Sequence, residues 1–210
     1  MDAAQRELSA QIDQATQRLL GTARIITEPD LRAASRLPGW TRAHVLAHLA
    51  RGADAMRHLL VGVRTGQDRS AYASAQAWQA DIEYRTDLGP RELADDLASS
   101  AMALRTVARQ LPAERWQFPV LVPGSAPFPA ADLLVRRLVE VELHHCDLGA
   151  GYTPADWPPA FTAMELAEPM RSQRQDRLSS TRTAAPLAPV RPPAPYRPNQ
   201  RLPGSWLGTR

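Results

Sequence analysis

Apolar residues recur at intervals of three and four along four segments of the chain, which is the pattern of amphipathic helices. The pattern predicts helices over about residues 3–26, 41–64, 90–111 and 130–148, with 132 as an alternative start for the last. Four long amphipathic helices in one chain favour an all-α fold, a four-helix bundle. The apolar stripe of the first helix is formed by Leu8, Ile12, Ala15, Leu19, Ala23 and Ile26.

Residues that start or stop helices stand at the ends of these segments. Thr41 is a candidate N-cap for the second helix, and Gly66 follows that helix as a stop signal. Pro90 opens the third helix, where acidic residues in the first turns suit the helix dipole. Gly149 stands where a helix commonly ends on a left-handed residue. The expected boundaries therefore rest on more than periodicity.

The segments between and after the helices differ in character. The connection over residues 66–89 is long, so the second and third helices need not be antiparallel neighbours. Residues 116–130 are expected to form a short hairpin or an extended loop beside the fourth helix. Residues 1–165 are thus predicted to be the helical bundle. Residues 166–210, rich in arginine and proline, are predicted to be a disordered or extended tail.

Composition and charge narrow the class of protein. The chain has 210 residues, 44% of them apolar and 22% charged, as in a soluble globular protein. No apolar run is long enough for a membrane span, and the polar start contains no secretory signal, so we expect a cytoplasmic protein without a membrane partner. The single cysteine, Cys146, excludes an intramolecular disulfide framework.

Charge is divided unevenly along the chain. Residues 171–210 hold eight arginines and one acidic residue, whereas residues 1–170 hold 17 arginines and 21 acidic residues. The bundle is therefore net acidic, which makes nucleic acid a poor candidate partner for it. The basic tail is a candidate contact for an acidic partner.

Residues 137–152, "RLVEVELHHCDLGAGY", combine two glutamates, two histidines, a cysteine and an aspartate. On a helix, residues four apart lie about 40° apart around the axis, so Glu140 and His144 share a face. Glu142 and Cys146 make a second pair on another face. The fourth helix therefore carries one Glu/His pair suited to binding a metal or moving a proton.

The second helix offers two candidate partners, His44 and His48. The neighbourhood of His48 is apolar. A histidine from this helix, together with Glu140 and His144, makes a set of two histidines and one carboxylate. That set suits Zn²⁺ or another divalent metal and leaves positions open for water or substrate.

Plainer interpretations stand beside this one. A Glu/His pair on a helix is often only a surface pair, and His48 alone is more typical of a hydrogen-bonded core histidine. His44 is a candidate solvent-facing residue of the first helical turn. Cys146 is most simply a small buried apolar residue. Glu142 and His145 are expected to be solvated or to support the ligands.

Two blocks together carry a resemblance. "LPGWTRAHVLAHLARGADAMRHLL", residues 37–60, and the stretch 137–152 resemble the mycothiol-dependent maleylpyruvate isomerase family, within the DinB-like superfamily of metal-binding four-helix bundles. The resemblance covers roughly residues 5–165. It implies a DinB-like fold and a divalent metal, typically zinc.

Carried over by position, the metal ligands that the resemblance implies are His48, Glu140 and His144. Asp147 stands where the family has the aspartate of its "HHxDLG" motif, and we expect it to support a ligand or the helix end, because metal-bound histidines usually donate their other N–H to an oxygen. Arg137, three residues before Glu140, is a candidate to orient that carboxylate, or else a plain surface arginine.

The resemblance also implies a chemistry. Zinc favours the thiolate of a thiol cofactor, here mycothiol, and the thiolate adds to the activated double bond of maleylpyruvate. Rotation and elimination then give fumarylpyruvate. The expected partners are thus a low-molecular-weight thiol and a small electrophile. Two alternatives stay open: a mycothiol S-transferase with another electrophile, and a non-catalytic, metal-containing binding or regulatory module.

One part of the family pattern is not matched. Family members of the isomerase type commonly continue into a second, sterol-carrier-like lobe that can supply a catalytic arginine. In this sequence the arginine- and proline-rich residues 166–210 stand in its place. No arginine of that lobe is therefore assigned here.

Overall fold

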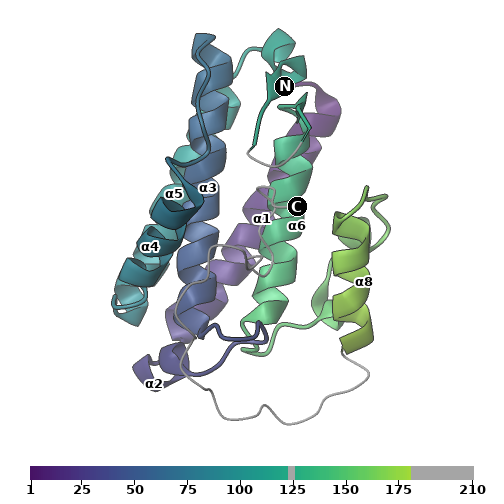
Figure 1. The fold of residues 1–210 in the computed structure, drawn as a ribbon. Helices are drawn as coiled ribbons and strands as arrows, with labels where there is room; N and C mark the ends of the chain where they lie inside the picture. The colour runs from purple at the N-terminus through teal and green to yellow at the C-terminus, as the bar shows by residue number, and fades with distance from the viewer. Residues whose placement is uncertain (123–125, 181–210) are drawn as a thin grey trace.

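The computed structural model describes residues 1–122 and 126–180 of the chain (Figure 1). The four predicted long helices are present, and each end lies within about two residues of its expected place. They are α1 (Ala3–Ile25), α3 (Arg42–Thr65), α5 (Pro90–Gln110) and α6 (Asp132–Asp147). The predicted all-α fold class is confirmed.

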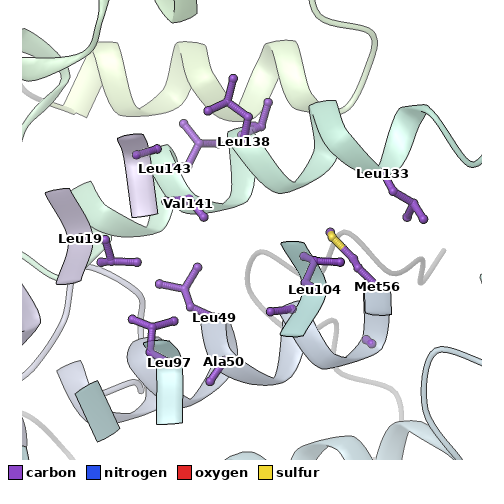
Figure 2. Close-up of a cluster of buried hydrophobic side chains, with 14 of the residues drawn as sticks. Leu19, Leu49, Ala50, Met56, Leu97, Leu104, Leu133, Leu138, Val141 and Leu143 are labelled. Carbon is purple, nitrogen blue, oxygen red and sulfur yellow. The ribbon is translucent and has the colours of Figure 1, made fainter. Parts of the chain in front are cut away.

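The long helices form a closed ring around one core. Helix α3 packs against α5 and α6, and α1 packs against the same two helices from the opposite side. Leucines from three of the helices, Leu19, Leu49 and Leu97, approach one another in this core, and Leu143 of α6 is buried with them (Figure 2). Burying each such side chain contributes about 1.5–3 kcal/mol, which is the main force holding the ring together.

The long connection between α3 and α5 contains a further helix. Helix α4 (Ala75–Arg85) begins after the N-cap Ser74 and buries Trp78 and Ile82, one turn apart, against α3. Helix α3 is therefore covered on three sides, by α4, α5 and α6. The connection between α1 and α3 holds the short helix α2 (Glu28–Arg32).

A small hairpin joins α5 to α6. After the 3₁₀ helix η1 (Ala113–Gln117), strand β1 (Pro119–Val120) pairs antiparallel with β2 (Phe128–Pro129). Of the two alternatives expected for residues 116–130, a short hairpin or an extended loop, the paired strands support the hairpin.

The predicted start of a disordered tail at residue 166 is wrong, because residues 170–180 form a helix. After η2 (Pro154–Asp156) and α7 (Pro159–Thr162), the chain turns back and α8 (Met170–Ser180) lies along α6 (Figure 1). Met170 is buried, and Arg177 binds Asp147 of α6. The rest of the predicted tail, with the acidic partner proposed for it, lies outside the described residues.

Candidate metal centre

The three predicted ligands meet at the contact between α3 and α6. His48 Nε2 lies 3.5 Å from Glu140 Oε1, and the rings of His48 and His144 are 4.9 Å apart, edge to face. All three side chains are at most 3% exposed. Glu140 and His144 face the same way because they are four residues apart on α6, and the packing of α3 on α6 brings His48 opposite them.

Three ring nitrogens in this group lack hydrogen-bond partners. Among residues 1–122 and 126–180, both nitrogens of His48 and Nε2 of His144 are buried and unpaired. A buried polar atom without a partner costs about 1–3 kcal/mol, so unpaired nitrogens close together need an explanation. Burial, followed by electrostatic interactions with His144 and Arg137, lowers the pKa of His48 well below its ordinary value. His48 is therefore neutral, which is the form that binds metals.

The orientation of His144 is set by a chain of two contacts. Its Nδ1 donates to Asp147 Oδ2 over 2.9 Å, so the lone pair is left on Nε2. Arg177 of α8 donates to the same carboxylate over 2.7 and 3.2 Å. Burial alone would raise the pKa of Asp147, but the hydrogen bonds from His144 and Arg177 outweigh it and lower that pKa. Asp147 is thus a charged acceptor that fixes the ring.

Glu140 is held from two directions. Arg137 Nη1 donates to Glu140 Oε2 and to the carbonyl of Leu49, both over 2.9 Å, so Oε1 is the oxygen that faces His48. On the other side, Gly52 of α3 leaves room for the carboxylate, because a Cβ at that position would collide with Glu140 Oε1. The sequence pattern placed Gly52 within a helix but did not reveal this role.

The candidate ligand atoms of His48, Glu140 and His144 are of the kinds that bind a divalent metal, but they are not arranged around a common centre. Within the described ranges, no group of three or more His, Cys, Asp or Glu side chains is placed so that it could hold a metal ion as it stands. Two bare imidazole nitrogens and one free carboxylate oxygen are nevertheless the donors that zinc takes. Binding would require these side chains to turn toward a common centre, and the metal remains a prediction.

Aromatic rings surround His48. Trp40 lies 5.3 Å and Trp78 5.9 Å from its ring, centroid to centroid, and both indoles are buried. Trp78 comes from α4, the helix that was not predicted, so its place beside His48 could not be expected. These rings keep the surroundings of the candidate ligands apolar, which strengthens electrostatic interactions there.

His44 has a structural role in helix capping, whereas His48 is a candidate metal ligand. The prediction that it faces solvent is wrong, because it is buried in the first turn of α3. Its Nδ1 lies 2.7 Å from Thr41 Oγ1, and its Nε2 lies 3.2 Å from Glu83 Oε2. Both nitrogens are thus engaged in capping α3 and in tying it to α4, which leaves neither for a metal.

A second polar cluster lies on the opposite face of α6, toward α1. Glu142 accepts from Arg18 Nη2 over 2.6 Å and from the Tyr152 hydroxyl over 2.7 Å. His145 stacks on Tyr152 and lies 2.7 Å from Thr22 Oγ1. The expectation that Glu142 and His145 are solvated or support the ligands is therefore wrong. Burial, with the Arg18 charge, lowers the pKa of His145 to about 4.

Cys146 is a buried apolar residue, as predicted. Burial, with the nearby charge of Asp147, raises the pKa of its thiol to about 12. The reactive form of a cysteine is the thiolate, so Cys146 is a poor nucleophile at neutral pH. If a thiolate reacts at the candidate metal centre, its thiol must come from another molecule and not from Cys146.

Comparison with known proteins agrees with these features. The model of the mycothiol maleylpyruvate isomerase N-terminal domain matches residues 12–149. The crystal structure of the mycothiol-dependent maleylpyruvate isomerase is 29% identical with a TM-score of 0.71, and that of its histidine-to-alanine mutant is 28% identical with the same TM-score. Each match covers 75% of this chain and 65% of the other chain, so this chain spans about two thirds of the length of those structures.

None of the curated proteins matches this chain. In the part of the chain that the structure describes, no helix has the length and apolar character needed to cross a membrane.

Proposed function

Because this chain belongs to the family of mycothiol maleylpyruvate isomerase N-terminal domains, we propose that it is a metal-dependent, mycothiol-using isomerase of the maleylpyruvate isomerase type. The observation that carries the proposal is the meeting of unpaired nitrogens of His48 and His144 beside Glu140 Oε1. All three residues lie within the matched range. The alternatives, an S-transferase and a non-catalytic module, would use the same centre.

The proposed roles follow from the contacts. A divalent metal such as zinc, when bound, would favour the thiolate of the cosubstrate at neutral pH. His48 and His144 would hold the metal through Nε2, and Glu140 through Oε1. Asp147 keeps the His144 proton on Nδ1, and Arg137 keeps Glu140 Oε2 engaged. The apolar rings of Trp40 and Trp78 limit water around His48.

The reaction itself would be simple addition and elimination. The thiolate of mycothiol would add to the activated double bond, which becomes a single bond about which the molecule can rotate. Elimination of the same thiolate would then give the trans isomer and return the thiol unchanged. The buried, high-pKa Cys146 supports a thiol cosubstrate, because the only cysteine of the chain is unsuited to this role.

The metal is tested by its content in protein purified without chelators. Wild type should hold about one zinc or other divalent ion per chain, and His48→Ala should lose it. His44→Ala is the matched control, since it removes a buried histidine one turn away that caps the helix, and it should keep the metal. Metal-free wild-type protein would contradict the proposal.

The thiol is tested separately by turnover. Maleylpyruvate should be isomerised by the metal-loaded protein only when mycothiol is present, and Glu140→Gln should abolish the turnover. Turnover at the same rate without a thiol would overturn the thiol step and leave the metal site standing. Metal binding without turnover would favour the S-transferase or the non-catalytic module.

A further inference from the structure

A pocket of about 250 Å³ lies between α1 and α5. Its walls are mostly apolar, and α3 and α6 close its inner end. None of the three candidate metal ligands lines it. The apolar side chains of the wall include Ile12, Leu20, Met56, Leu60, Leu133 and Leu134. The volume is just below the range typical of drug-sized ligands, about 300–1,000 Å³, so it suits a small molecule.

One polar group stands at the inner end of this apolar pocket. Arg137 lines the pocket, is 1% exposed and forms an ion pair with the Glu140 carboxylate through Nη1. Its Nη1 is used by Glu140 and by the Leu49 carbonyl, but its Nη2 has no hydrogen-bond partner among the described residues. A buried, charged N–H group without an acceptor is costly, and a ligand oxygen would relieve that cost.

The mouth of the pocket favours an anion. Arg24, Arg105 and Arg109 line it and are exposed, and Asp13 is the acidic residue among the lining side chains. Arg105 and Arg109 both approach Asp13, at 3.3 and 3.7 Å, so one carboxylate is shared between two cations. A surplus of positive charge at an apolar opening raises the local concentration of anions.

We infer that this pocket binds a small apolar monocarboxylate, whose carboxylate accepts a hydrogen bond from Arg137 Nη2 and whose apolar body lies along the leucines of the wall. A planar guanidinium matches a carboxylate better than it matches a neutral hydroxyl. The inference goes beyond the proposed isomerase function and does not depend on it, since neither a metal nor a thiol takes part in the binding.

The test uses octanoate as the probe and full-length protein in isothermal titration calorimetry. Octanoate should bind, and it should bind about tenfold or more tightly than octanol, because octanol has the same apolar chain but no charge for Arg137. Equal affinities for octanoate and octanol would overturn the role of Arg137, and no binding of octanoate would overturn the site.

Two variants locate the binding. Ala101→Phe fills the pocket from α5, leaves the Arg137 residue itself in place and should weaken octanoate binding at least tenfold. Ala103→Phe is its matched control, because Ala103 lies on the same helix, is also half-buried and does not line the pocket. Unchanged binding in Ala101→Phe, or equal loss in both variants, would place octanoate elsewhere and overturn the inference.

Arg137→Met then tests the charged end of the pocket. It should remove the preference for octanoate over octanol while leaving octanol affinity within about twofold. If this variant fails to fold, because Glu140 loses its partner, the Ala101→Phe and Ala103→Phe pair still decides the location. A preserved preference for octanoate in folded Arg137→Met would contradict the inferred contact.

Discussion

At the residue scale, the geometry of the candidate metal centre depends on side chains that are not ligands themselves. Asp147 decides which nitrogen of His144 is bare, and Arg137 decides which oxygen of Glu140 faces His48. Gly52 contributes through its lack of a side chain, which leaves room for the Glu140 carboxylate. Such supporting positions commonly change metal affinity by about 10–100-fold when they are altered.

Gly52→Ala should therefore weaken zinc binding by about tenfold or more, because the new Cβ pushes the Glu140 carboxylate out of its place. Competition with a chromophoric chelator measures the affinity. Gly21→Ala on α1 is the matched control, since among the described residues nothing lies within 4 Å of its Cβ position. The control should keep its zinc affinity and gain about 0.4–1 kcal/mol of stability. Unaltered zinc affinity in Gly52→Ala would show that Glu140 is not confined by this glycine.

At the scale of elements, the long helices were predictable and the short ones were not. Helix α5 repeats its apolar residues over about six turns, so its period is plain. Helix α4 buries only Trp78 and Ile82 along its length, and α8 buries only Met170. Neither helix therefore has an apolar stripe long enough to be recognised in the sequence. Both are held by contacts with α3 or α6 that arise only once the bundle has formed.

Arg51 of α3 adds an ionic contact to the apolar packing that holds α4 on the bundle. This guanidinium donates to Asp96 of α5 over 2.8 Å and lies 3.5 Å from Asp81 of α4. Arg51→Met should lower the free energy of unfolding by about 2 kcal/mol. This loss is smaller than the loss expected when one partner of a fully buried ion pair is removed, because the partners of Arg51 are partly exposed. Urea denaturation measures this, and hydrogen exchange should accelerate in α4 first. Arg91→Met, an exposed arginine on α5, should change stability by less than about 0.5 kcal/mol. Equal losses in the two variants would contradict the anchoring role.

Helix α8 is connected to the candidate centre through Arg177. Arg177→Gln removes the cation that holds Asp147, so His144 is less firmly oriented, and zinc affinity should fall by about tenfold. Arg171→Gln, on the same helix, affects only the exposed pair with Glu168 and should leave affinity unchanged. The chelator competition used for Gly52 gives both values. If the two variants bind zinc equally well, α8 has no part in the centre.

At the scale of the whole molecule, identifying the candidate site requires both the helical periodicity of the sequence and the packing of the helices. The shared face of Glu140 and His144 follows from spacing on one helix, so it could be predicted from the residues. The choice of His48 over His44 could not, because it depends on how α3 is rotated against α6. The packing turns His48 toward α6 and leaves His44 with Thr41 and Glu83.

Because the three proposed ligands come from two helices, metal binding should stabilise the bundle as a whole. A ligand that binds only the folded state, at 100 times its dissociation constant, adds about 2.7 kcal/mol. For a domain of this size that corresponds to a rise in Tm of about 5–10 °C. Differential scanning calorimetry of metal-stripped protein with added zinc should show this rise in wild type and in His44→Ala, and a chelator should reverse it. His48→Ala should show no rise, and a rise equal to wild type in that variant would mean that the zinc which stabilises the fold binds elsewhere.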